Sequence, residues 1–448
     1  MEENKMGVMP VKPLILSMSL PMMASMLVQA LYNIVDSIFV ARVSESAVTA
    51  VTLVFPMQNL MIALGMGAGV GVNALLSKGL GEKNYQHSDN AANMGLLLTG
   101  FHYIFFLLVG LFISKIFINS QTDDPEIAAY AISYLRIISV LSFGCFFQVM
   151  LERLLQSTGR THLSMISQMS GAIINIILDP IMIFGLFGFP RLEVAGAALA
   201  TCVGQICAAC IGTYLNLKRN PDIHLSYSRI FKPHGETIKS IYFIGVPSML
   251  MMAIGSVMTY FMNIITGKFS STAQAVFGVY FRLQSFFFMP VFGLNNGLIP
   301  VMAYNYGAKR KDRIMEALKF SLFLGVGIML MGTLVFGLFP KYLLMIFKAS
   351  DEMVRIGVPA LRTIGLSYPM AAVAIMLGSV FQAFAKSYYS FFVSIARQLL
   401  VLIPVAWLLS MTGVINSVWW AFPIAEVVSL SVTTVFFRKV KRTVIDTL

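Results

Sequence analysis

The stretch LILSMSLPMMASMLVQALYNIVDSIFV, residues 14–40, decides the class of fold. Its only charged residue is Asp36, and about 20 mostly apolar residues are enough for a helix to cross a lipid bilayer. The preceding residues 1–12 are polar and mixed in charge, and the apolar run is too long for the core of a signal peptide. We therefore expect a retained first membrane span, without a cleavable signal.

The composition extends this reading to the whole chain. Of 448 residues, 57% are hydrophobic and only 12% are charged, and the mean hydropathy is +0.79. Soluble domains carry about 25% charged residues, so a soluble globular protein is excluded. The 34 Gly and 17 Pro suit a bundle of membrane helices, where neighbouring helices satisfy the backbone groups that these residues free.

Apolar runs bounded by charges or by Gly and Pro predict an all-α polytopic membrane protein with twelve transmembrane helices. The loops are short and leave no room for a sizeable domain outside the membrane. The twelve predicted spans are residues 14–40, 50–77, 92–118, 127–155, 163–187, 194–217, 238–266, 275–303, 315–339, 353–384, 388–410 and 414–437.

The basic residues predict the orientation. With the N-terminus in the cytoplasm, the inside segments hold twenty Lys and Arg and the outside segments seven. By the positive-inside rule, both termini are then cytoplasmic. The net charge of +12 could instead indicate binding of nucleic acid, but the basic residues are spread over every inside loop, and we expect no nucleic-acid partner.

The second half of the chain repeats the first at a shift of 226 residues without a gap. Six helices are thus repeated in the same orientation, which implies pseudo-symmetry about an axis along the membrane normal with a cavity between the halves. The matched pairs are Pro21 and Pro247, Phe55 and Phe281, Gln58 and Gln284, Gly67 and Gly293, Gly71 and Gly297, Gly81 and Gly307, Lys83 and Lys309, Leu135–Arg136 and Leu361–Arg362, and Gln156 and Gln382.

These matches predict two six-helix lobes. The N-terminal lobe covers residues 1–217, a cytoplasmic linker covers residues 218–238, and the C-terminal lobe covers residues 239–448. The linker is the longest polar stretch of the chain and joins the sixth and seventh spans. This architecture is typical of transporters more than of enzymes.

Two aspartates inside predicted spans are candidates for an ion site. Asp36 follows Tyr32 by one helical turn, and Asp179 follows Asn175 by one turn, so each pair presents two polar groups on one helix face. An acid at the bilayer centre costs about 2.5–3.5 kcal/mol on insertion scales, and such residues usually face a polar cavity or an ion path. The alternative is structural, because Asp179 and Pro180 could together break a helix.

Other intramembrane features have open roles. Glu426 lies on the last span and Glu152 near a cytoplasmic end, while Arg136, Arg282, Arg362 and Arg397 could neutralise acids whose identity the sequence does not give. Pro21 lies in the middle of the first span and predicts a kink. That kink could change during transport or be static.

The sequence does not predict an enzyme. The spans offer no arrangement of Ser, His and Asp and no cluster of His and Glu that spacing alone supports as a catalytic or metal site. Cys207 and Cys210 form a CxxC within a span without a second thiol pair at metal spacing. We expect no cofactor, and no metal apart from a sodium ion at the acidic site.

Three motifs resemble the multidrug and toxic compound extrusion (MATE) family, and most closely its prokaryotic DNA-damage-inducible-type branch. They are Leu31-Tyr32-Asn33-Ile34-Val35-Asp36 with Pro21 upstream, Asn175-x-x-x-Asp179-Pro180, and Ala195-Gly196-Ala197-Ala198-Leu199-Ala200-Thr201. Gln156-Ser157-Thr158-Gly159-Arg160 also looks like a recurrent cytoplasmic turn of the family. The resemblance covers essentially the whole chain.

The resemblance implies a secondary antiporter that exports amphipathic, often cationic organic compounds in exchange for H⁺ or Na⁺ by alternating access. By motif, the cation-coupling residues are Tyr32, Asp36, Asn175, Asp179 and Thr201, of which Asp36, Asn175, Asp179 and Thr201 could hold Na⁺. Gln29, Asn33 and Met262 are expected to line the substrate cavity. Met262 is the position that matches Asp36 in the repeat, so the coupling site is expected in the N-terminal lobe alone.

A flippase for a lipid-linked saccharide or lipid is the alternative function, because it shares the two-lobed architecture. It would be expected to have additional helices or a strongly cationic cavity. We expect a monomer in the cell membrane whose partners are the lipid bilayer and small organic substrates. The sequence leaves open which substrates are moved, whether H⁺ or Na⁺ drives export, and to which side the cleft opens.

Overall fold

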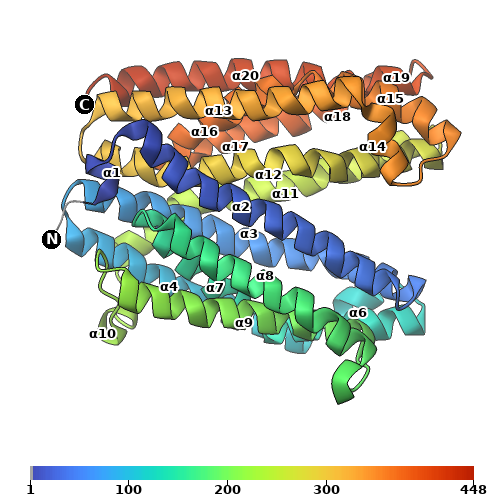
Figure 1. The fold of residues 1–448 in the computed structure, drawn as a ribbon, viewed down its shortest axis with the longest axis horizontal. Coiled ribbons are helices and arrows are strands. Elements are labelled where there is room, and N and C mark those ends of the chain that lie inside the picture. The colour runs from blue at the N-terminus through green and yellow to red at the C-terminus, as the bar shows by residue number, and fades with distance from the viewer. Residues whose placement is uncertain (1–3) are drawn as a thin grey trace. The chain divides into compact units, whose positions relative to one another are not determined.

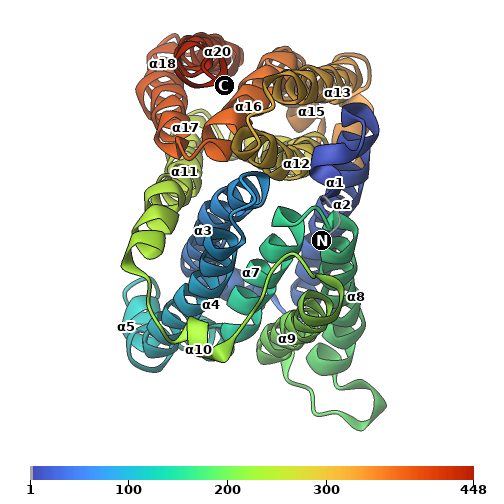
Figure 2. The same cartoon turned by 90° about the vertical axis from the view of Figure 1, so that its left-hand side faces the viewer.

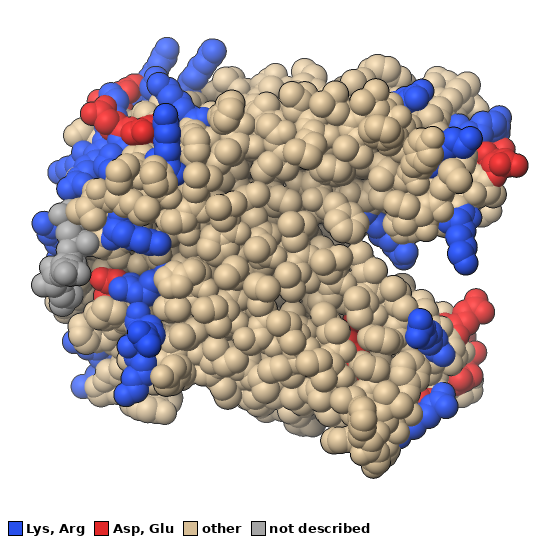
Figure 3. Space-filling model, viewed as in Figure 1, with Lys and Arg blue, Asp and Glu red and all other residues tan. Residues whose placement is uncertain are grey.

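The computed structural model describes residues 4–448, which form helices joined by short loops (Figure 1). Ten helices are long and apolar enough to cross a membrane, and two bent helix pairs bring the number of candidate spans to twelve. The predicted all-α fold is thereby confirmed, and each predicted span overlaps one helix or one bent pair. On the face that Figure 3 shows, Lys and Arg side chains gather at the two ends of the helices.

The chain divides into two compact units, which we call the N-unit, Ala24–Met249, and the C-unit, the residues up to Met23 with Leu250–Leu448. Two long helices cross from one unit to the other. α2 (Val11–Ala41) crosses between Met23 and Ala24, and α11 (Gly235–Gly267) crosses between Met249 and Leu250. The two crossing points are 226 residues apart, the shift of the internal repeat.

The N-unit contains the end of α2, the beginning of α11 and the elements between them. These are α3 (Glu45–Gly81), α4 (Tyr85–Leu108), the π-helical turn η1 (Val109–Ile113), α5 (Ser114–Asn119), α6 (Pro125–Val140), α7 (Phe143–Ser157), α8 (Thr161–Phe184), the 3₁₀ turn η2 (Leu186–Gly188), α9 (Glu193–Arg219) and α10 (Tyr227–Ile230).

The C-unit contains the beginning of α2, the end of α11 and the remaining elements. These are α1 (Lys5–Val8), α12 (Ser271–Gly307), α13 (Lys311–Leu338), α14 (Pro340–Ile346), α15 (Asp351–Gly365), α16 (Tyr368–Ala383), α17 (Ser387–Ser394), η3 (Ile395–Leu402), α18 (Ile403–Ser410), α19 (Ile415–Val418), α20 (Ala421–Val440) and η4 (Lys441–Ile445), with η3 and η4 π-helical.

The sequence repeat is a repeat of structure. α3 and α12 begin and end at matched residues, and each starts with a serine cap: Ser44 accepts from Ala47 N and Ser270 from Ala273 N, both over 3.0 Å. The turns after these helices also match, because Lys83 and Lys309 adopt positive φ angles of 58° and 56°. Side-chain caps and left-handed residues fix helix ends, so the two halves begin and end their spans alike.

Glycines explain how the crossing helices pack. A Cβ on Gly71 of α3 would lie 2.3 Å from the Ile241 carbonyl oxygen of α11, and a Cβ on Gly297 of α12 would lie 2.8 Å from Ser19 Cα of α2. Each second span of a repeat therefore lies directly against the backbone of the first half of the other repeat's first span. The compact units thus differ from the predicted lobes, because each unit includes the first half of the other repeat's first span. The lobe boundaries remain a prediction.

The fourth and tenth spans are each broken, which the sequence reading did not anticipate. α6 and α7 meet at 46°, and α15 and α16 at 44°. At both joints a backbone hydrogen bond spans three residues instead of the four of an α-helix. These bonds run from Ser142 N to Ser139 O and from Ser367 N to Ile364 O. They interrupt the i to i−4 pattern of the helix, and at the second joint Pro369 in the first turn of α16 also lacks a backbone donor.

Candidate functional site

The predicted coupling residues lie on three helices of the N-unit. Tyr32 and Asp36 are on α2, Asn175 and Asp179 on α8, and Thr201 on α9. α8 and α9 run side by side (Figures 1 and 2). A pair of glycines, Gly171 on α8 and Gly204 on α9, lets the two helices pack closely. A Cβ on Gly171 would lie 2.9 Å from the Gly204 carbonyl oxygen, and one on Gly204 would lie 2.6 Å from the Gly171 carbonyl oxygen.

This glycine contact brings Thr201 to Asn175, one turn away along each helix. With the Asn175 amide oxygen facing α9, that oxygen accepts from Thr201 Oγ1 over 3.2 Å and from Thr201 N over 2.9 Å. The amide nitrogen then donates to Asp179 Oδ2 over 3.1 Å. We assign this orientation because it gives the amide oxygen two donors and the amide nitrogen an acceptor.

Asp36 completes the cluster from α2. Its carboxyl group lies close enough to that of Asp179 for the two to interact directly, and the Tyr32 hydroxyl lies beside Thr201. Two carboxyl groups can share a hydrogen bond only when one of them carries a proton. All five predicted coupling residues lie together, and the cluster contains a place for one proton.

The α8 and α9 side of the site is buried from solvent, whereas Tyr32 and Asp36 on α2 are partly buried. Asp179 is 0% exposed, Asn175 2% and Thr201 4%, and Asp36 Oδ1 is a buried oxygen without a hydrogen-bond partner among residues 4–448. Carboxylate, amide and hydroxyl oxygens are the ligands that hard cations prefer. The cluster can thus hold either a proton or a small cation such as Na⁺. Within residues 4–448, no group of three His, Cys, Asp or Glu side chains is arranged for a metal.

The structural alternative for Asp179 and Pro180 is wrong. α8 continues through Pro180 to Phe184, where Gly185 ends it with a φ of +73°. Asp179 does not cap a broken helix, because its carboxyl group contacts Asn175 and Asp36.

Sequence reasoning missed Tyr134. It lies on α6, is 2% exposed, and is close enough to interact electrostatically with Asp36 and Asp179. No local motif marks it, because a tyrosine on the buried face of an amphipathic helix resembles any other core residue. The packing of α6 against its neighbours, α9 among them, brings it to the site.

The three predicted substrate-cavity residues differ in their surroundings. In the N-unit, Gln29 and Asn33 are exposed on α2, and Gln29 Oε1 accepts from Gln168 Nε2 of α8 over 3.0 Å. In the C-unit, Met262 is 0% exposed. The role of these residues in binding substrate stays a prediction. Pro21 lies inside α2 two residues before the crossing point, and the helix continues through it.

Two of the open intramembrane acids have partners. In the C-unit, Glu426 Oε1 of α20 lies 2.8 Å from Arg397 Nη1 of η3. In the N-unit, Glu152 is 6% exposed and accepts from Gln148 Nε2 over 2.9 Å. The sequence could not pair Arg397 with Glu426, because the contact depends on how two helices face each other.

A twofold repeat of six membrane helices with a buried carboxyl pair defines a membrane transporter of the two-lobed class. The family model described as MatE matches residues 21–181 and 247–408. The two matched segments start 226 residues apart, at the shift of the internal repeat. The chain belongs to the MatE family and is a transporter, not an enzyme.

Known relatives cover nearly the whole chain. It is 25% identical over 420 residues to "Multidrug export protein MepA" of Staphylococcus aureus strain MRSA252, covering 93% of this chain and 91% of that protein. It is 27% identical over 421 residues to the protein of the same name from Staphylococcus haemolyticus strain JCSC1435, covering 92% and 89%.

Solved structures share the fold. A MATE transporter crystallised in the straight conformation has a TM-score of 0.93 at 24% identity, covering 100% of both chains. An outward-facing MATE family transporter of the MOP superfamily has a TM-score of 0.92 at 24% identity, covering 100% of this chain and 99% of the other.

Proposed function

We propose that this transporter is a secondary active antiporter that exports amphipathic, often cationic organic compounds in exchange for H⁺ or Na⁺. The substrate class is supported by the multidrug export relatives, which cover 93% and 92% of the chain. The coupling is supported by the proximity of the Asp36 and Asp179 carboxyl groups inside the N-unit.

The geometry favours H⁺ as the coupling ion. Two ionised carboxylates in contact would repel each other in a medium of low dielectric, and a single bound proton removes most of that repulsion. The pair then titrates as one coupled unit, so the protons belong to the pair rather than to either residue. Na⁺ would replace the shared proton between the same oxygens.

Ion binding is transmitted through α2. This helix carries Tyr32 and Asp36 in the N-unit and Pro21 in the C-unit, so it links the coupling site to the other unit through a segment that lacks one helical hydrogen bond. Neutralising Asp36 changes which contacts this half of α2 prefers. A bistable helix of this kind is a recognised element of conformational switching.

The available energy is adequate. One elementary charge that crosses a potential of 100 mV releases about 2.3 kcal/mol, enough for roughly a fifty-fold substrate gradient at full coupling. We place the protein in the cell membrane with both termini in the cytoplasm, since most Lys and Arg of the loops are then on the inner side.

Transport in proteoliposomes tests the proposal. The purified chain is reconstituted, and movement of radiolabelled tetraphenylphosphonium is measured under a pH gradient alone and under a Na⁺ gradient alone. Export driven by the pH gradient supports H⁺ antiport, and export driven only by the Na⁺ gradient assigns Na⁺ to the same site. Equal flux with and without either gradient would overturn antiport.

The flippase alternative has less support. Such a protein would be expected to have additional helices, whereas residues 4–448 form at most twelve candidate spans. A fluorescent lipid-linked saccharide tested in the same vesicles is expected to remain in its original leaflet.

A further inference from the structure

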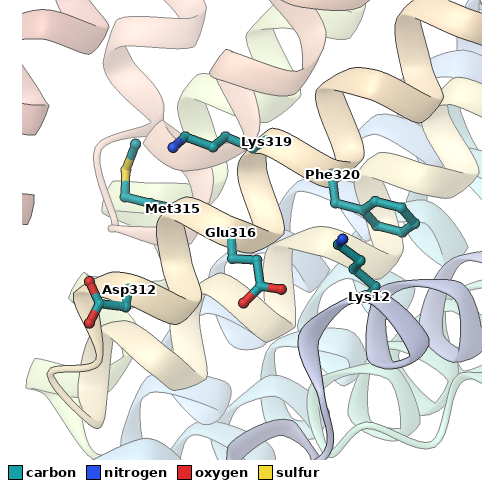
Figure 4. Close-up of a pocket in the computed structure, with 6 residues that line it drawn as sticks. All are labelled: Lys12, Asp312, Met315, Glu316, Lys319 and Phe320. Carbon is teal, nitrogen blue, oxygen red and sulfur yellow. The ribbon is translucent and has the colours of Figure 1, made fainter.

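A pocket with charges of both signs lies in the C-unit and includes none of the coupling residues. It has a volume of about 500 Å³ and is lined by Lys12 of α2 and by Asp312, Met315, Glu316, Lys319 and Phe320 of α13 (Figure 4). Lys12 reaches from α2 toward the α13 side chains (Figure 4). Nothing in the transport cycle proposed above uses these residues.

The pocket lies at the depth of lipid headgroups. Lys12 directly precedes residues 13–35 of α2, and Lys319 directly precedes residues 320–340, and neither stretch contains a charged residue. At 1.5 Å per residue, the second stretch is about 30 Å long, which is the thickness of the hydrocarbon core. Both lysines therefore lie at the polar boundary of the bilayer, where Lys side chains extend toward phosphate groups.

An exposed apolar track leads from the pocket along each helix. On α13 it continues through Phe323, 74% exposed, Gly327, beside which a Cβ would meet nothing within 4 Å, and Leu334, 55% exposed. On α2 it continues through Leu16 and Leu20, 37% and 55% exposed. In a membrane protein, such helix faces contact acyl chains.

The charges of the pocket match one kind of headgroup. None of the four charged side chains of the pocket takes part in an ion pair within the part of the chain that the structure describes. Asp312 and Glu316 are one helical turn apart and present two carboxylates on one face of α13. Lys12 and Lys319 supply two ammonium groups, which suit a phosphodiester.

From this juxtaposition we propose that the pocket binds the headgroup of an aminophospholipid, a lipid with a phosphodiester anion and a primary ammonium group. The lysines bind the phosphate, the carboxylates accept hydrogen bonds from the ammonium group, and the acyl chains lie along α2 and α13. A trimethylammonium headgroup cannot donate those hydrogen bonds, and a glycerol headgroup lacks the positive charge. Phosphatidylserine has the ammonium group but also a carboxylate, which Asp312 and Glu316 would repel, so the preferred lipid is phosphatidylethanolamine.

Native mass spectrometry of the full-length protein in detergent tests the assignment. The protein is titrated with dioleoyl phosphatidylethanolamine, phosphatidylcholine and phosphatidylglycerol. We expect phosphatidylethanolamine to bind at least about five-fold more tightly than the other two lipids. This ratio corresponds to about 1 kcal/mol, which two contacts between the ammonium group and the carboxylates can supply. Equal binding of the three lipids overturns the proposal.

Matched variants separate the two halves of the headgroup. Asp312→Asn with Glu316→Gln is expected to reduce binding of phosphatidylethanolamine to the level of phosphatidylcholine, and Lys12→Gln with Lys319→Gln to weaken binding of all three lipids. The control is Asp123→Asn with Glu126→Gln, which removes two exposed acids outside the pocket. Glu126 matches Asp312 because each is the second residue of its helix. An unchanged lipid preference in the Asp312 and Glu316 variant contradicts the assignment.

Two further measurements keep the test decisive. Soluble glycerophosphoethanolamine, the same headgroup without acyl chains, is expected not to displace the lipid at millimolar concentration; displacement would show that the apolar track is not used and overturn the lipid assignment. The elution profile and melting temperature of each variant establish that it is folded.

Discussion

At the scale of single residues, the coupling site depends on an amide and a hydroxyl as much as on its two acids. Asn175 connects Asp179 to Thr201, and the Thr201 hydroxyl also contacts Tyr32. A buried hydrogen bond contributes about 0.5–1.5 kcal/mol net, but an unsatisfied partner costs about 1–3 kcal/mol. Small polar changes should therefore alter proton binding without destroying the fold.

Replacement of Thr201 tests this connection. Thr201→Val removes the hydroxyl and keeps the shape, so the pH of half-maximal transport should shift, while Thr201→Ser should behave like the unsubstituted protein. The measurement is initial transport rate against pH in proteoliposomes. If valine and serine gave the same profile as threonine, the hydroxyl would have no part in the site.

Tyr134 offers a second test beside the acids. Tyr134→Phe should change the pH profile of transport, because a hydroxyl close to Asp36 and Asp179 is lost. Tyr130, one turn earlier on α6, donates to Glu193 over 2.5 Å instead, and Tyr130→Phe is the matched control. Identical effects of the two substitutions would speak against a specific role for Tyr134.

Glu426 and Arg397 are expected to act as a unit. Arg397→Met alone leaves a buried carboxylate without its cation and should destabilise the protein by about 3–5 kcal/mol, whereas Arg397→Met with Glu426→Gln should recover much of that loss. A double-mutant cycle of thermal unfolding in detergent measures the coupling. Additive losses would mean that the ion pair does not carry the effect.

At the scale of helices, glycine contacts rather than charges determine how the spans cross. Gly71→Ala should destabilise the N-unit by about 1–3 kcal/mol, because its Cβ would meet the Ile241 carbonyl oxygen, a backbone atom that cannot rotate away. Gly100→Ala, where nothing lies within 4 Å, should be neutral or slightly stabilising. The melting temperatures of the two variants check this, and equal changes would contradict it.

The same scale shows how far the sequence could lead. Apolar runs and flanking charges predicted all twelve candidate spans, because the bilayer imposes a minimum length on each. The breaks after α6 and α15 were not predicted, although Gly365 and Pro369 flank the second joint and Gly144 lies just after the first. Tyr134 and the pairing of Arg397 with Glu426 were missed because both depend on packing between separate helices.

At the scale of the whole molecule, the loop charges predict the orientation in the membrane. In a cysteine-free background, Lys309→Cys should react with an impermeant maleimide only after the cells are permeabilised, whereas Asp123→Cys should react in intact cells. Labelling of Lys309→Cys from outside would reverse the topology, and with it the direction in which the coupling ion moves.

The central claim is that the Asp36 and Asp179 pair binds the ion that is exchanged for substrate. Proton release is the most direct measurement. Tetraphenylphosphonium is added to the purified protein in weakly buffered detergent solution, and the released protons are counted with a pH dye. We predict release of about one proton per bound cation. In Asp36→Asn with Asp179→Asn, we predict none, with substrate still bound; release by that variant equal to that of the unsubstituted protein would contradict the account.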